Sequence, residues 1–191
     1  MPRLSLIPIF VLSSMLPLTA QPPQLPRPAP PLEVSMPNGS KLSLSKYAGK
    51  VCVVEFLFTT CPHCQESAKM FRGLMQQYAP QGLNVVGAAF NDNAMMLVPD
   101  FSKNFAADSF PIGVVPREKV FQFMNFSMMA RISVPMFAVI DKKGQIRYQS
   151  ALDGSDNLHS EPKMRQVIEE LLKEPANGVS KKATGTSKKT D

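Results

Sequence analysis

Two uninterrupted apolar runs lie in the first half of the chain. Residues 51–58 and 83–90 consist mainly of β-branched, small and aromatic side chains, which is typical of strands buried on both faces. Between them, apolar residues recur at helical spacing from Ala68 to Tyr78, and residues 79–82 contain the proline and glycine that end a helix. The order strand, helix, strand predicts a right-handed βαβ unit whose parallel strands end at one reactive edge.

Alternating apolar and polar residues predict two β-hairpins, one on each side of this unit. Residues 32–36 and 41–45 flank a Pro-Asn-Gly-Ser turn, and residues 136–141 and 145–150 flank Lys-Lys-Gly. An amphipathic helix is expected over residues 161–173, because its apolar residues fall on one face. Between the second strand and the second hairpin, the pattern predicts two helices and a short edge strand, at residues 91–106, 117–126 and 110–115 respectively.

The two ends differ in composition from this segment, which is expected to form one domain over residues 33–173. A basic start, an uncharged apolar stretch and Ala20 at the expected cleavage position predict a secretory signal peptide over residues 1–20. An uncleaved membrane anchor is the alternative, although prolines interrupt a run shorter than the ~20 apolar residues of a spanning helix. Residues 21–32 are too proline-dense for helix or sheet and predict a stiff linker. Residues 174–191 are polar and lysine-rich and predict a disordered tail.

Charge changes this picture little. The formal net charge is +6, but Arg3 supplies one positive charge and residues 181–191 supply three, which leaves +2 for the rest. A domain with so small an excess has no nucleic-acid footprint, so no nucleic-acid partner is expected. Three cysteines are too few for a disulfide-stapled small secreted domain, and their expected roles are chemistry and packing.

The candidate chemistry is the pair Cys61 and Cys64 in Thr-Thr-Cys-Pro-His-Cys, between a buried strand and an amphipathic helix. A zinc site normally needs two further ligands at matching spacing, and the chain offers only His63 and the distant His159. The pair is therefore predicted to be a redox dithiol, with neither metal nor separate cofactor. Cys61 at the helix N-terminus is the expected nucleophile, because N–H groups and the helix dipole stabilise a thiolate there. Cys64, one turn further on, is the expected resolving thiol.

Four other side chains, of His63, Glu55, Cys52 and His159, are candidates for chemistry or for packing. His63 can add positive charge beside the dithiol and make its disulfide more oxidising; the alternative is an exposed turn residue without effect. Glu55 lies within an apolar strand, where burial would raise its pKa, unless its carboxyl group reaches an edge. Cys52 lies about 20 Å from the reactive edge, at ~3.3 Å per strand residue, and is expected in the core. His159 is expected in a surface loop.

Residues 50–64 resemble the active-site strand and loop of the thioredoxin superfamily, and the upstream hairpin with Gly49-Lys50 resembles its exported TlpA/ResA-like branch, related to the redoxin/AhpC-TSA group. The resemblance implies an α/β, thioredoxin-like fold with a central mixed sheet flanked by helices and an N-terminal hairpin extension. It also implies that Pro135 is a cis-proline, which with Val134 faces the dithiol and pairs with a bound peptide. Glu55 would be the buried acid that relays protons to the second cysteine.

The resulting prediction is an exported, periplasmic or extracytoplasmic, thiol-disulfide oxidoreductase, tethered to the membrane if the signal segment is retained. Client protein thiols and disulfides, and a membrane or soluble electron partner, are the expected partners of a monomeric protein. A TlpA/ResA-like reductase is favoured, and a DsbA-like oxidant is the first alternative. The Pro-His dipeptide of the motif matches DsbA, but residues 90–134 are too few for that family's helical insertion.

Two further alternatives depend on other side chains. Peroxiredoxins have threonine three residues before the reactive cysteine, where this chain has Phe58, which argues against peroxide reduction. A non-enzymatic copper(I) chaperone would combine the two cysteines with thioether ligands. The methionines available to such a site near Pro135 are Met124, Met128, Met129 and Met136.

Overall fold

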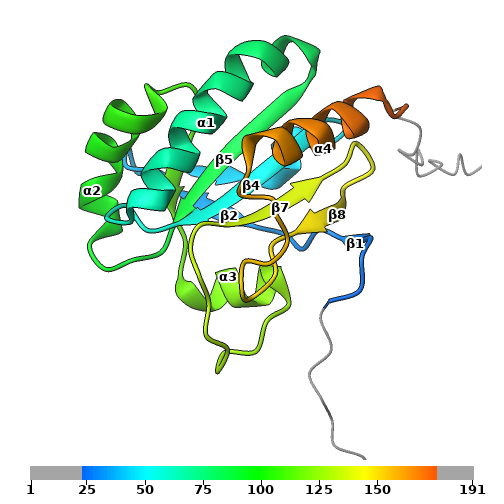
Figure 1. The fold of residues 1–191 in the computed structure, drawn as a ribbon. Helices are drawn as coiled ribbons and strands as arrows, with labels where there is room; N and C mark the ends of the chain where they lie inside the picture. Colours follow the sequence, from blue (N-terminus) through cyan, green and yellow to red (C-terminus); the bar gives the residue numbers. More distant parts are fainter. Residues whose placement is uncertain (1–22, 176–191) are drawn as a thin grey trace, which may run out of the picture.

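A mixed sheet runs through residues 23–175, the part of the chain that the computed structural model describes (Figure 1). The predicted signal peptide and nearly all of the predicted tail lie outside the described residues. Within the described part, no helix has the length and apolar character to cross a membrane. The strand order is β1-β8-β7-β4-β5-β6-β2-β3. The strands are β1 (Arg27–Pro28), β2 (Glu33–Ser35), β3 (Lys41–Ser43), β4 (Val51–Leu57), β5 (Leu83–Ala89), β6 (Ile112–Val114), β7 (Met136–Ile140) and β8 (Gln145–Gln149).

The predicted βαβ unit is confirmed at the centre of the sheet. Strands β4 and β5 pair in parallel over seven residue pairs, and helix α1 (Pro62–Tyr78) connects them. Every residue of β4 is buried, because helices cover both faces of the sheet. The helix begins directly after the carboxyl end of β4, which places the cysteine motif at the predicted edge.

The hairpin of β7 and β8 lies on the other side of β4. Strand β7 pairs antiparallel with both β4 and β8. This arrangement makes the sheet mixed, as the resemblance implied. Met136, the first residue of β7, therefore lies at the same end of the sheet as the last residues of β4, and Pro135 precedes it.

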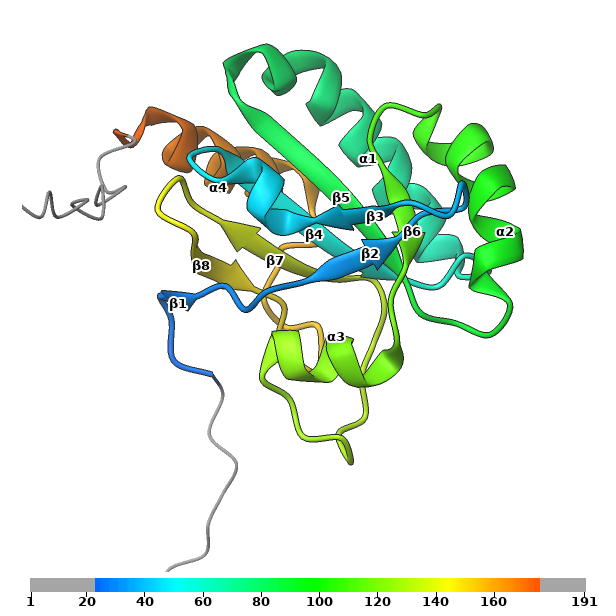
Figure 2. The same cartoon turned by 180° about the vertical axis from the view of Figure 1, so that it is seen from behind.

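The predicted position of the third parallel strand was wrong. Residues 112–114 form β6, but this strand is internal, because the N-terminal hairpin of β2 and β3 pairs against its free side. Figure 2 shows this hairpin beside β6, and Gly113 permits the close approach: a Cβ atom there would lie 2.5 Å from the carbonyl oxygen of Ser35. Local sequence cannot indicate which distant segment covers a strand edge.

The predicted linker is also partly bound to the sheet. Arg27 and Pro28 form β1 and pair antiparallel with β8. Proline is tolerated here because an edge strand needs no donor on its outer side. The guanidinium of Arg27 donates to the carbonyl oxygen of Phe123 (2.6 Å) and to the side chain of Gln149 (2.7 Å). Residues 27 and 28 of the predicted linker are therefore held along the β8 edge.

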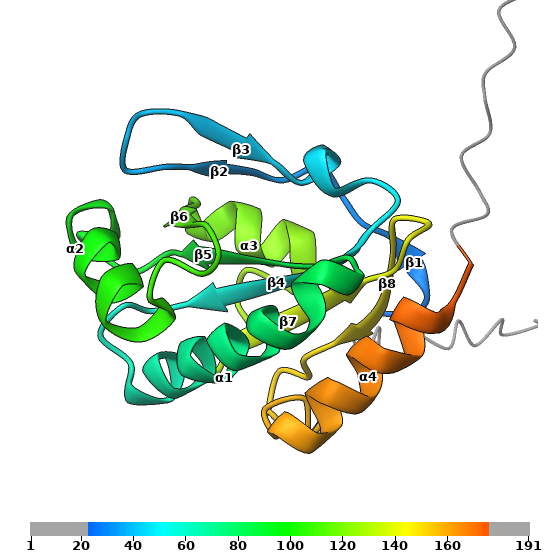
Figure 3. The same ribbon diagram turned by 90° about the horizontal axis from the view of Figure 1, so that it is seen from above.

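Helices cover the two faces of the sheet unequally. Helices α1, α2 (Ala94–Phe101) and α4 (Glu161–Lys173) pack on one face, with Phe71, Leu74 and Ile168 in its core. Helix α3 (Arg117–Met124) packs on the other face (Figure 3). The three helices predicted outside the βαβ unit are confirmed; the first is interrupted, because a π-helical turn (Ser102–Ala106) continues α2. Two 3₁₀ turns, Leu44–Tyr47 and Ala79–Gln81, complete the elements.

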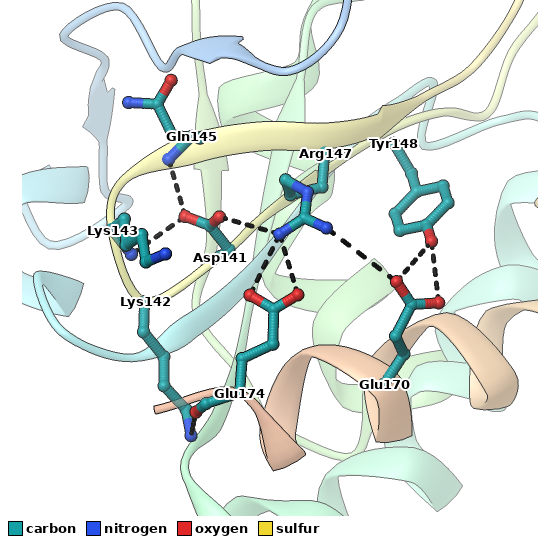
Figure 4. A network of polar contacts seen from close by, with 8 residues as sticks. All are labelled: Asp141, Lys142, Lys143, Gln145, Arg147, Tyr148, Glu170 and Glu174. Carbon is teal, nitrogen blue, oxygen red and sulfur yellow. Dashed lines mark hydrogen bonds and ion pairs between the residues drawn. The ribbon is translucent and has the colours of Figure 1, made fainter. Parts of the chain in front are cut away.

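A polar network fixes α4 to the hairpin of β7 and β8, at the opposite end of the sheet from the cysteines (Figure 4). The carboxylate of Asp141 is 2% exposed and accepts the backbone N–H groups of Lys143 and Gln145, both at 2.9 Å. The guanidinium of Arg147 lies 3.3 Å from Asp141 and donates to both carboxylate oxygens of Glu174, at 2.9 and 3.0 Å. One guanidinium thus joins the hairpin turn to the end of the last helix.

Substitution Arg147→Ala is expected to lower the free energy of unfolding by about 2 kcal/mol, because the partly buried carboxylates lose a charged donor. Chemical denaturation of the two proteins measures this difference. The matched control is Lys41→Ala, whose partner Glu33 is an exposed carboxylate at 3.3 Å, and which should cost no more than about 0.5 kcal/mol. Equal losses in the two variants would show that the network contributes nothing specific.

Candidate functional site

The cysteine motif occupies the start of α1. Cys61 is the residue before the helix, with extended backbone angles (φ −86°, ψ 122°), and Pro62 takes the first helical position. Proline fits there because the first turn has N–H groups without helical partners. The N–H of Cys61 donates to the carbonyl oxygen of Phe58 (3.1 Å), which closes a tight turn after β4. The Cys61 side chain is partly exposed at the positive end of a 17-residue helix.

A side chain that the sequence analysis did not consider holds this turn. Asn91, which follows β5, accepts the backbone N–H of Thr59 at its Oδ1 (2.9 Å) and donates from Nδ2 to the Thr59 hydroxyl (3.1 Å). Beside it, the rings of Phe58 and Phe90 pack edge to face with centroids 4.6 Å apart. The general rule that parallel strands end together could have indicated this contact, since both residues follow neighbouring strands.

Cys64 is completely buried, one turn along α1. Both Cys61 and Cys64 carry free thiols in this structure. Burial raises the pKa of the Cys64 thiol well above its usual range, and the charge of Glu55 raises it further, although the backbone N–H of Phe58 donates to its sulfur at 3.4 Å. The Cys61 thiol is therefore partly exposed, and the Cys64 thiol is fully buried.

The peptide bond between Val134 and Pro135 is cis. The Sγ atom of Cys61 lies 3.8 Å from the carbonyl oxygen of Val134, across 73 residues of sequence. The segment before β7 therefore faces the first cysteine, where the resemblance placed a peptide-binding backbone.

Glu55 is buried with 0% exposure on the face of β4 that α1 covers. Its alternative position, with the carboxyl group at a strand edge, is excluded by this burial. The hydroxyl of Ser67 is hydrogen-bonded to Oε1, and Oε2 has no hydrogen-bond partner among the described residues. Burial raises the pKa of Glu55 to about 8, against the lowering effect of the Ser67 hydrogen bond. A carboxyl group with such a pKa can take up and release a proton near neutral pH.

His63 lies on the surface, with its side chain 81% exposed and its Nδ1 atom 3.5 Å from Glu66. Both line a groove of about 450 Å³ that continues past Val134 and Pro135 to His159. The sequence predicted a surface loop for His159, and the structure places this loop residue beside the site. The centroid of its ring lies 5.0 Å from the centroid of the Phe137 ring. The lining residues are His63, Glu66, Ser67, Met70, Val134, Pro135, His159 and Glu161.

The remaining candidates lie elsewhere. Cys52 is buried in the core on the opposite face of the sheet from Cys64, and burial raises its pKa to about 12. Met124 and Met136 are buried in the same core as Cys52, on the opposite face of the sheet from Cys64. Neither is therefore available beside the dithiol as a copper ligand. Met129 is 92% exposed. Residues 23–175 contain no cluster of three histidine, cysteine or carboxylate side chains suited to a metal ion.

Comparisons with known proteins identify a family and a fold for this chain. The family model described as Redoxin matches residues 26–168, which is most of the chain. Among proteins with curated functions, none matches the sequence. Solved structures do match over most of the described residues.

Three of these structures are from bacteria. A thiol:disulfide interchange protein of the thioredoxin family from Chlorobium tepidum is 21% identical with a TM-score of 0.65, and covers 78% of this chain and 99% of its own. A DsbF homologue from Corynebacterium diphtheriae is 19% identical (TM-score 0.62; 77% and 88% covered). The thioredoxin domain of a thiol-disulfide oxidoreductase from Bacteroides vulgatus is 13% identical (TM-score 0.58; 74% and 96% covered). At these identities the likeness establishes the thioredoxin-like fold.

Proposed function

Because the chain belongs to the Redoxin family, we propose that it is a thiol-disulfide oxidoreductase whose redox group is the pair Cys61 and Cys64. The observation that carries this proposal is the placement of the two thiols: Cys61 is accessible at the start of α1, and Cys64 is buried one turn behind it. An accessible thiol can form a mixed disulfide with a large partner, and a protected thiol can then break it without competition from other partners.

The proposed cycle reduces a client disulfide. The Cys61 thiolate attacks one client sulfur, the client disulfide breaks, and the departing client thiolate takes a proton from solvent. Cys64 then gives its proton to Glu55 and attacks Sγ of Cys61, which releases the second client thiolate. Two electrons pass to the client and a disulfide forms between Cys61 and Cys64. An electron partner must reduce this disulfide before the next cycle.

Glu55 suits the proton step of this cycle. Its carboxyl group lies in the same buried environment as Cys64, whose pKa its charge raises. A base with a pKa near 8 is well matched to operation near neutral pH, because it is partly ionised there and still basic enough to accept a thiol proton. Val134 and Pro135, which line the groove beside Cys61, would bind the client backbone.

Export is part of the proposal. The apolar segment over residues 1–20 has the pattern of a secretory signal, and a dithiol enzyme that serves disulfide-bearing clients belongs in an oxidising compartment. The partners would be client proteins and a membrane or soluble electron donor, with the protein acting as a monomer and without metal or other cofactor. His63 would tune the dithiol through its charge.

The equilibrium reduction potential of the Cys61–Cys64 pair, measured against glutathione and dithiothreitol buffers, tests the activity and its direction. A reductase is expected to have a potential near thioredoxin's ~−270 mV, whereas a value near DsbA's ~−120 mV would identify a disulfide-introducing oxidant. Cys52→Ala is the matched control and should leave the potential unchanged, because Cys52 lies in the other core. The absence of a reversible two-electron couple would contradict the proposed activity.

A further inference from the structure

Among residues 23–175, Ser67 is the one side chain that both lines the groove and is hydrogen-bonded to the buried carboxyl group of Glu55. It lies on α1, is 8% exposed and lines the groove with His63 and Glu66. Its hydroxyl is hydrogen-bonded to Oε1 of Glu55, the only hydrogen bond of that carboxyl group among the described residues. Within the described residues, the Ser67 hydroxyl group is therefore the polar link between the buried carboxyl group of Glu55 and the groove.

The Ser67 hydroxyl has two acceptors and one hydrogen. Besides Glu55, the carbonyl oxygen of Cys64 lies 3.0 Å from Oγ. When Glu55 is ionised, the hydroxyl must donate to the carboxylate, which has no other donor. When Glu55 is protonated, its own O–H can donate to Oγ, and the hydroxyl hydrogen is free to turn to the Cys64 carbonyl. Each charge state of Glu55 thus has its own hydrogen-bond direction, without movement of heavy atoms.

A serine in a helix commonly donates to a carbonyl three or four residues earlier, and the bond to Cys64 has this form. That role alone would not need Glu55. The two roles predict different effects. A hydrogen bond to the Cys64 carbonyl oxygen affects the stability of the helix backbone, whereas the hydrogen bond to Glu55 affects the ionisation of a carboxyl group on β4.

We propose that Ser67 is a positioning residue that allows the buried Glu55 to ionise. Its hydroxyl group donates to Glu55 when the carboxyl group is ionised, and to the carbonyl oxygen of Cys64 when the carboxyl group is protonated. This inference rests on the proposed function, in which Glu55 accepts the Cys64 proton. In the resetting step, Glu55 passes that proton to Oγ while the hydroxyl proton leaves for water in the groove. One proton moves from Glu55 to solvent, Ser67 ends as it began, and no electrons are transferred.

The surroundings contain few other groups that titrate. At the start of α1 these are Cys61, the residue before the helix, and Cys64, His63 and Glu66 in its first two turns, of which His63 and Glu66 line the groove. From the segment before α4 and from its first turn, His159 and Glu161 complete the groove. The residues that pair with Glu55 on the neighbouring strands are Gly87 and Phe137, so the sheet contributes no competing proton acceptor at this position.

Two variants of the full chain separate the two roles of Ser67. Ser67→Ala removes the hydroxyl and suits a helix, and Ser67→Thr keeps a hydroxyl that can reach the same partners. The side-chain carboxyl signal of Glu55, followed by ¹³C NMR across pH in the reduced protein, should move its midpoint upward by about one pH unit in Ser67→Ala. Ser67→Thr should remain close to the wild-type midpoint.

The rate at which Cys64 resolves a preformed mixed disulfide supplies the second measurement. In Ser67→Ala this rate should fall roughly tenfold at pH 7 and approach the wild-type rate above pH 10, because a midpoint one pH unit higher leaves one tenth as much ionised Glu55 at neutral pH. In a Glu55→Gln background, Ser67→Ala should have no further effect.

An unchanged Glu55 midpoint in Ser67→Ala, or an equal slowing in the Glu55→Gln background, would overturn the inference and leave the oxidoreductase proposal intact. The converse is also distinguishable. If the cysteine pair lacked a reversible couple, the proposed function would fail, while the NMR titration would still report whether Ser67 sets the ionisation of Glu55.

Discussion

Replacing Cys61 with serine is expected to abolish disulfide exchange, with a fall in rate of at least about 10³-fold. The reaction needs a thiolate at the accessible position, and a serine hydroxyl at the helix N-terminus remains protonated and cannot form a mixed disulfide. Turnover of a disulfide-bonded model protein, followed by the appearance of client thiols, measures the loss.

Cys64→Ser is expected to give a different result from Cys61→Ser. Cys61 can still attack a client, but the protected position no longer holds a thiol to break the mixed disulfide, so covalent adducts should accumulate. Mass spectrometry of the protein after exposure to client disulfides detects them. The control is Cys52→Ala, which keeps both active thiols and should retain exchange. Full exchange by Cys61→Ser, or a Cys64→Ser variant that forms no adduct, would refute the assigned roles.

Glu55→Gln is expected to remove most of the pH dependence of stability between pH 4.5 and 8. The unfolded chain loses the Glu55 proton near pH 4.5, whereas the folded protein holds it until about pH 8. Between these values the folded state binds the extra proton, so the free energy of unfolding falls as pH rises. Stability due to neutral Glu55 is complete below pH 4.5 and lost above pH 8, a change of up to about 5 kcal/mol.

Chemical denaturation at intervals from pH 4 to pH 9 measures this effect. Wild type should lose stability steadily over the interval, and Glu55→Gln, which is neutral at every pH and nearly the same size, should give a flatter curve and be the more stable protein above pH 8. Glu33→Gln, which removes an exposed carboxylate on β2, should leave the wild-type slope. Parallel curves for wild type and Glu55→Gln would show that Glu55 has the same pKa in the folded and unfolded states, against the prediction.

The buried position of Glu55 has opposite effects on stability and on the proposed chemistry. A carboxyl group with 0% exposure and one hydrogen bond costs stability whenever it is ionised, and an apolar residue would suit the core of β4 better. The same burial raises its pKa to about 8, the range that the proposed proton transfer from Cys64 requires. Under the proposed function, this position loses stability at high pH and gains a proton acceptor for Cys64, a trade that functional sites commonly show.

The periodicity of apolar residues in the sequence was sufficient to predict most of the strands and helices. The continuous apolar run of β4, the helical spacing of α1 and the alternation in the β7–β8 hairpin each depend on neighbouring residues, which is why the sequence predicted these elements and the βαβ unit. The position of Cys61 before a helix and of Cys64 inside it follows from the same local pattern. The burial of Glu55 followed from its place in an apolar strand, and the cis peptide bond before Pro135 followed from the family resemblance.

Only the tertiary structure decided which distant segments meet. The contact of Cys61 with the Val134 carbonyl spans 73 residues, and the hairpin on β6 and the attachment of Arg27 to the β8 edge join similarly distant segments. His159 lines the groove because its loop folds back beside the start of α1. Ser67 contacts Glu55 because α1 packs on the face of β4 that carries the Glu55 side chain. Local sequence encodes which side of each element is apolar, whereas the pairing of those sides depends on the packing of the whole chain.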